Sequence, residues 1–166
     1  MEIPVSLYLT PHLGLSEEMY EDGYENITNI DYSSKVIGQM EDKCKTKFPK
    51  LVFKVMDVLE MKDFQSGEFN TILDKGTLDS VLCGDNSVPL AAKMMGEVYR
   101  VLAPGGHYMC ISYGDPEISK KYIETQPWES VKVDKLAKPS AAVVANLNTD
   151  ENDVKNFHYV YTMTKK

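Results

Sequence analysis

Short apolar segments alternate with segments of helical periodicity along most of the chain, and this alternation constrains the fold more than any other feature. Four apolar runs have the length and β-branched content of strands: Val5 to Leu9, Ile27 to Tyr32, Leu51 to Val58 and Phe69 to Leu73. Helical spacing appears between the second and third runs, from Ser33 to Phe48, and again from Ser87 to about Leu102. Because alternating strands and helices form parallel sheets with right-handed crossovers, the pattern predicts helices on both faces of a mostly parallel sheet.

The last third of the chain has a different pattern. A fifth strand is predicted from His107 to Ser112, and the segments Glu129 to Leu136 and Phe157 to Thr164 then alternate apolar and polar residues, as antiparallel edge strands do. We therefore predict an α/β fold, a doubly wound Rossmann-like sandwich whose mostly parallel sheet ends in an antiparallel edge hairpin. The connection from Ala137 to Asn156 has no clear pattern, and both an ordered hairpin insert and a loop are open for it.

The composition is that of one globular domain, which we expect to span residues 1–166. A hydrophobic content of 43% and a charged content of 26% argue against disorder. The formal net charge of -7 argues against a nucleic acid partner, because phosphate binding needs a clustered basic surface. A basic protein surface is a more suitable partner by charge complementarity.

Neither a metal site nor membrane insertion is expected. The three cysteines form no CxxC pair and the three histidines are isolated: Cys44, Cys83, Cys110, His12, His107 and His158. The N-terminal sequence MEIPVSLYLTPH has no basic region, and its apolar run is too short to span a bilayer. We therefore expect a cytoplasmic protein with no disulfide framework and no membrane segment.

An acidic residue closes each of three separate predicted strands: Asp31, Asp57 and Asp74. Because neighbouring parallel strands bring their carboxyl ends to one edge, these side chains, with Lys75, Thr77 and Asp79 of the turn after the fourth strand, are candidates to face a ligand. The alternative for each aspartate is an ordinary turn or cap residue. For the turn itself, the alternative is that Thr77 caps a helix from Leu78 to Cys83.

Four motifs occur in one order along the chain: YENITNIDYSS, FKVMDVLEM, ILDKGTLDSVL and EVYRVLAPGGHYMCISYG. Together they resemble the seven-strand (class I) S-adenosylmethionine-dependent methyltransferases, and in particular the methyltransferase-like proteins that include lysine methyltransferases of translation elongation factor 1-alpha. The resemblance covers most of Ser16 to Gly114, and the edge segments KLAKP and HYVYTMTKK extend it to the C-terminus.

The resemblance implies a role for each strand end. Asp31 with Tyr32 would hold the ribose of S-adenosylmethionine, Asp57 with Val58 the adenine, and Asp74 with Lys75 would face the sulfonium and methionine end. The reaction would be methyl transfer to a lysine amine of a protein substrate, such as a translation elongation factor. Because this transfer needs mainly orientation and a neutral amine, no single catalytic base is expected.

The chain departs from the family near its N-terminus. Where the family has a glycine-rich loop, this sequence reads Tyr8-Leu9-Thr10-Pro11-His12-Leu13, and relative to the family we expect an N-terminally truncated domain. If two hydrogen bonds to the cofactor are lost at about 1.5 kcal/mol each, affinity falls on the order of 100-fold. A non-catalytic methyltransferase-fold protein that acts as a protein-binding module is therefore the alternative function.

Overall fold

The computed structural model describes residues 6–9, 14–114, 116–138 and 157–166. Its strands are β1 (Ser6–Tyr8), β2 (Ile27–Asp31), β3 (Val52–Val55), β4 (Phe69–Lys75), β5 (Leu102–Ser112), β6 (Trp128–Ala137) and β7 (Phe157–Lys165). Its helices are α1 (Leu15–Glu21), α2 (Ser34–Cys44), α3 (Thr77–Leu82), α4 (Ser87–Val101) and α5 (Pro116–Ile123). In this part of the chain no helix is long and apolar enough to cross a membrane.

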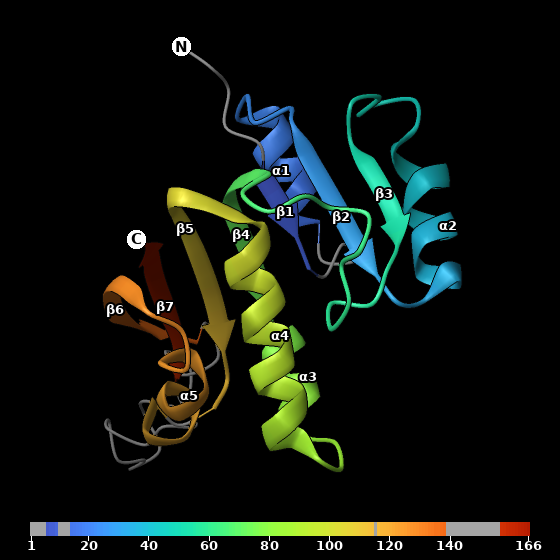
Figure 1. Ribbon diagram of the computed structural model, residues 1–166. Coiled ribbons are helices and arrows are strands. Elements are labelled where there is room, and N and C mark those ends of the chain that lie inside the picture. Colours follow the sequence, from blue (N-terminus) through green and yellow to red (C-terminus); the bar gives the residue numbers. More distant parts are fainter. Residues whose placement is uncertain (1–5, 10–13, 115, 139–156) are drawn as a thin grey trace, which may run out of the picture.

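The strands form one seven-stranded sheet in the order β3-β2-β1-β4-β5-β7-β6 (Figure 1). β1 to β5 are parallel, and β7 runs antiparallel to both of its neighbours, β5 and β6. The predicted doubly wound, mostly parallel sheet is thus confirmed. The antiparallel β6–β7 pair is also present, but β7 lies inside the sheet and only β6 forms the edge.

Burial explains why β7 takes the inner place. Tyr159, Tyr161 and Met163 alternate along β7 and are buried, whereas β6 is exposed along most of its length. A strand with one continuous apolar face gains more from a neighbour on each side than a strand rich in charged residues does.

Side-chain alternation divides the core into two layers. On β1, Leu7 packs into the layer beneath α3, α4 and α5, whereas Tyr8 packs with the residues of α1 and α2. Ile72 and Leu73 of β4 divide in the same way. The helices therefore cover both faces of the sheet, with α4 lying across β4 and β5 on one of them (Figure 1).

One helix was not expected from the sequence. α5 begins at Pro116, has Glu117 in its first turn and has Lys120 and Lys121 in its last turn. This arrangement complements the helix dipole and is the signal from which α5 could have been predicted. Most of the segment Ala137 to Asn156, for which two structures were open, lies outside the described residues.

Candidate functional site

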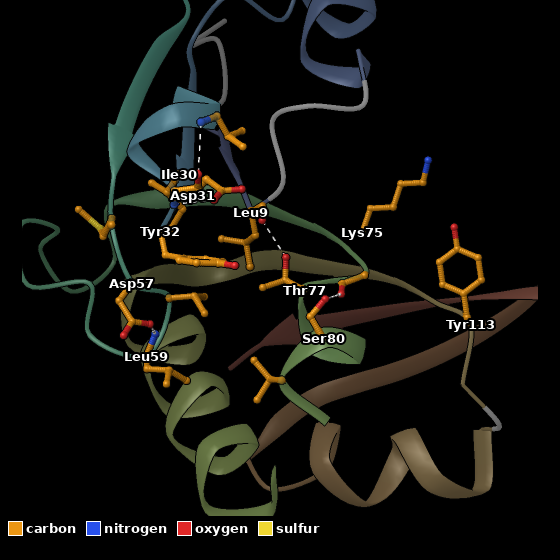
Figure 2. A pocket seen from close by; sticks show the side chains of 16 residues that line it. Leu9, Ile30, Asp31, Tyr32, Asp57, Leu59, Lys75, Thr77, Ser80 and Tyr113 are labelled. Carbon is orange, nitrogen blue, oxygen red and sulfur yellow. Dashed lines mark hydrogen bonds between the residues drawn. The ribbon is translucent and has the colours of Figure 1, made fainter. Parts of the chain in front are cut away.

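A cleft of about 840 Å³ opens at the carboxyl ends of the parallel strands (Figure 2). Its walls come from the ends of β1, β2, β4 and β5, from the turn after β3 and from the first turns of α2 and α3. This is where ligands bind in open α/β sheets, because the strand-to-helix connections leave a crevice there.

Asp31 ends β2 and lies in the wall of the cleft. The backbone N–H of Ser33 donates to its Oδ1 at 2.8 Å, and Ser33 in turn caps α2, because its Oγ accepts from the N–H of Val36 at 3.3 Å. Within the described residues, Oδ2 of Asp31 has no hydrogen-bond partner. The carboxylate is therefore held in place by one oxygen while the other can accept from a ligand.

Asp57 has the same arrangement in the turn after β3. The N–H of Leu59 donates to its Oδ1 at 2.8 Å, and Asp57 is exposed at the edge of the cleft next to Val58. Tyr32 is 84% exposed, and Figure 2 shows it between Asp31 and Asp57, on the same side of the opening. The structure thus brings these four predicted residues to one wall.

Asp74 does not line the cleft. Its side chain is 1% exposed and accepts from the N–H of Thr77 at 2.8 Å, from the N–H of Leu78 at 3.2 Å and from the hydroxyl of Tyr108 at 2.8 Å. Burial raises the pKa of Asp74, although these donors act in the opposite direction. Of the residues predicted to face a ligand, Asp74 and Asp79 do not line the cleft, since the Asp74 carboxylate holds the β4–α3 turn and the Asp79 carboxylate accepts from Ser112 and Tyr113.

The alternative interpretation of the turn, in which Thr77 caps α3, is wrong because another residue takes the N-cap position. Gly76 is the N-cap residue, its φ of 83° lies in the left-handed region, and the Asp74 carboxylate satisfies the first N–H groups of the helix. The Thr77 hydroxyl donates instead to the carbonyl oxygen of Leu9 at 2.7 Å. This bond joins the end of β1 to the turn, so both segments line the cleft together.

Two residues of the segment Tyr8 to Leu13, which stands where the resemblance implies a glycine-rich loop, are described: Tyr8, which is buried, and Leu9. Leu9 is 4% exposed, packs in the core and also lines the cleft, so its side chain is accommodated without filling the opening. Thr10, Pro11, His12 and Leu13 lie outside the described residues.

Lys75 and Tyr113 lie on the side of the cleft away from Asp31 and Asp57 (Figure 2). Lys75 was predicted to face the ligand. Tyr113 was not singled out from the sequence, although its position directly after β5 is the signal that could have placed it at this edge. Asp79 stabilises that position, because its carboxylate accepts from the Ser112 hydroxyl and, at 2.9 Å, from the N–H of Tyr113.

The strand order and the cleft define a class: doubly wound α/β proteins that bind a ligand at the carboxyl ends of their strands. Comparison with known proteins identifies the family within this class. The methyltransferase domain family matches residues 13–162, and the chain belongs to that family.

Two named relatives show where the similarity extends. The chain is 41% identical over 111 residues to the eEF1A lysine and N-terminal methyltransferase of Bos taurus, covering 66% of this chain and 16% of the relative. It is 34% identical over 110 residues to the EEF1A lysine methyltransferase 4 of Mus musculus, covering 61% of this chain and 42% of the relative. The chain therefore spans less than half the length of either protein.

Solved structures share the fold. An S-adenosylmethionine-dependent methyltransferase from Mesorhizobium loti has a TM-score of 0.73 at 11% identity, covering 98% of this chain and 91% of that one. The N-methyltransferase NodS from Bradyrhizobium japonicum, in complex with S-adenosyl-L-homocysteine, has a TM-score of 0.68 at 14% identity, covering 98% of this chain and 78% of that one. At these identities the likeness is one of architecture.

Proposed function

We propose that this chain is an S-adenosylmethionine-dependent methyltransferase domain that transfers a methyl group to a lysine amine of a protein. The observation that carries the proposal is the placement of Asp31 and Asp57, which follow neighbouring strands and line one cleft. The cleft volume of about 840 Å³ falls in the range of roughly 300–1,000 Å³ that is usual for small-molecule and cofactor sites.

The residues present suit the parts of an adenosine. Asp31 offers Oδ2 to the ribose hydroxyls, and Asp57 offers a carboxylate oxygen to the exocyclic amine of adenine. The apolar side chains Ile30, Met56 and Val81 also line the cleft and provide surfaces for the ring. Bound here, S-adenosylmethionine would supply a methyl group on a positively charged sulfur.

The protein's own contribution is orientation. Lys75 and Tyr113 stand at the far side of the cleft, where the methionine end and the incoming amine would meet. No covalent nucleophile is needed, because holding two reactants in line provides a large part of the rate enhancement in such a transfer. Asp74 acts as a positioning residue that fixes the turn carrying Lys75 and Thr77.

The names of the relatives favour a protein lysine as the methyl acceptor. Both matched relatives are named as eEF1A lysine methyltransferases, so the proposed partner is a protein such as this elongation factor. Since the chain spans only part of those proteins, the acceptor is a proposal to be tested directly.

Calorimetric titration with S-adenosylhomocysteine, which cannot turn over, tests the cofactor site. We expect saturable binding by the wild type and at least a tenfold loss of affinity in Asp31→Ala, because a hydrogen bond to a charged acceptor contributes about 1.5–3 kcal/mol. Asp22→Ala is the matched control, since Asp22 is exposed and does not line the cleft. Absence of heat at millimolar ligand would leave the non-catalytic binding module as the function.

Incubation of the purified chain with cell lysate and labelled cofactor tests the acceptor. The expected product is methyllysine, identified by mass spectrometry of the labelled protein and missing with Asp31→Ala. Label found only on another residue type would reject lysine while retaining the methyltransferase.

A further inference from the structure

β6 forms the edge of the sheet at the end opposite β3 (Figure 1), and within the described residues its outer side has no strand partner. The strand is 10 residues long, is exposed along most of its length and packs extensively only against β7 among the described elements. An unpaired edge presents backbone N–H and C=O groups that can pair with another chain, and proteins usually protect it with proline, bulges or charges. From Ser130 to Ala137 the pairing with β7 is regular and the sequence has no proline, so charged side chains are the protection that this part of the edge has.

The charges of β6 have opposite signs on either side of an apolar residue. Side chains two residues apart point to the same face of a strand, so Lys132 and Asp134 lie side by side, and their charged groups pair at 2.8 Å. Both side chains stay exposed to solvent, at 72% and 53%. Val133 lies between them in the sequence, points to the other face and is 40% exposed. The sequence of charge around Val133 therefore reverses when the strand is read backwards.

A second copy of β6 has the order of charges that complements this edge. When two identical strands pair antiparallel about a twofold axis perpendicular to the sheet, opposite side chains point to the same face, so a central residue pairs with itself. With Val133 at the centre, Lys132 of each copy stands opposite Asp134 of the other, and the two Val133 side chains meet. The remaining pairs join no like charges: Ser130 with Leu136, Val131 with Lys135, and Glu129 with Ala137.

The two neighbouring symmetric registers near the middle of the strand bring like charges together. A centre at Asp134 places two carboxylates opposite each other, and a centre at Lys132 does the same for two ammonium groups. The second of these registers also pairs Glu129 with Lys135, but Glu129 lies at the irregular start of the strand, where the pairing with β7 shifts. Charge therefore selects the register centred on Val133.

We propose that β6 is a dimerisation strand, through which two copies of this chain join edge to edge in the register centred on Val133. The contact is isologous, so it closes after two copies and does not continue into a filament. One strand pair is a small interface, and we expect a dissociation constant of roughly 10–100 μM. The inference goes beyond the proposed function and does not depend on it, because no residue of β6 lines the cleft.

Exposed edge strands also bind extended peptides of other proteins. The order of charges favours a second copy, because an unrelated peptide does not require opposite charges placed symmetrically about Val133. The symmetry also supplies the test, since in a symmetric pair each substitution acts twice.

Sedimentation velocity of the full chain from micromolar to submillimolar concentration tests the proposal. We expect the wild type to change from monomer to dimer with concentration, and the dimer to weaken as salt rises, because the ion pairs across the interface are exposed. Lys132→Glu places like charges opposite each other at two positions, and so does Asp134→Lys, so each variant should dimerise at least about tenfold more weakly. An equimolar mixture of the two variants should associate again, since every substituted side chain then faces the opposite charge.

Lys45→Glu and Asp42→Lys are the matched controls. These two residues form an exposed ion pair of the same length, 2.8 Å, at the end of α2 and away from β6, so both control variants should dimerise as the wild type does. A monomer at every concentration would overturn the proposal and leave the edge to a foreign peptide. A dimer that both β6 variants retain would place the contact elsewhere, and failure of the mixed variants to associate would reject the register centred on Val133.

Discussion

The role of Asp74 depends on the face of β4 to which its side chain points. β4 extends to Lys75, so Asp74 points to the same face as Ile72, which is fully buried in the layer beneath α3. There the carboxylate meets the first N–H groups of α3 and the Tyr108 hydroxyl. Lys75, one residue later, points the other way and lines the cleft.

Removal of this carboxylate should destabilise the domain. In Asp74→Ala the N–H groups of Thr77 and Leu78 and the Tyr108 hydroxyl lose their acceptor, so we expect the free energy of unfolding to fall by about 3 kcal/mol or more. Tyr108→Phe removes one donor only and should cost about 1–2 kcal/mol. Urea denaturation measures both, and equal losses would show that the capping bonds contribute little.

The buried carboxylate also predicts a dependence of stability on pH. Because burial raises the pKa of Asp74 in the folded state above its ordinary value of 3.8, the folded protein binds this proton more tightly than the unfolded chain does. The resulting stabilisation is complete below pH 3.8 and is lost as pH rises through the raised pKa. Relative to the wild type, the non-titrating Asp74→Asn should therefore gain stability as pH rises across that window. A stability difference between the wild type and Asp74→Asn that stays the same at every pH would contradict a raised pKa of Asp74.

At the scale of elements, α4 fixes the long connection between β3 and β4 that carries Asp57. Arg100 donates to the carbonyl oxygens of Phe64 at 2.8 Å and Met61 at 2.9 Å, and Glu97 accepts from the N–H of Met61 at 2.7 Å. Arg100 and Glu97 also pair with each other, and this hydrogen bond lowers the pKa of Glu97. The side of α4 that carries Arg100 and Glu97 thus fixes one end of the connection between β3 and β4, and the other end of this connection forms a wall of the cleft.

Arg100→Ala should therefore affect both stability and binding. We expect a loss of about 2 kcal/mol in the free energy of unfolding, because two carbonyl groups lose charged donors, and a weaker affinity for S-adenosylhomocysteine. Lys93→Ala, at an exposed position on the same helix, is the control. Unchanged cofactor affinity with reduced stability would show that the loop keeps its shape without Arg100.

At the scale of the whole molecule, the cleft joins segments from β1 to β5, so a bound ligand should stabilise the fold as a unit. A ligand at a hundredfold excess over its dissociation constant stabilises the folded state by about 2.7 kcal/mol. For a chain of this size the melting temperature should then rise by about 5–10 °C. Differential scanning fluorimetry with S-adenosylhomocysteine measures this, and the rise should be much smaller in Asp31→Ala. A constant melting temperature up to millimolar ligand would mean that the cleft does not bind it.

The sequence by itself determined most of the elements, with the exception of α5, and the edge of the sheet where the site lies. All five parallel strands were predicted, although β3 ends at Val55 instead of Val58 and β5 begins at Leu102 instead of His107. The position of Asp31 and Asp57 at or just after the ends of their strands was enough to bring them together, because parallel strands share the direction of their carboxyl ends. The inner place of β7, the burial of Asp74 and the meeting of Tyr113 with Lys138 and His158 were decided only by the tertiary structure. Local patterns fix which residues form a strand, whereas strand pairing and the depth of a side chain depend on contacts between segments far apart in the chain.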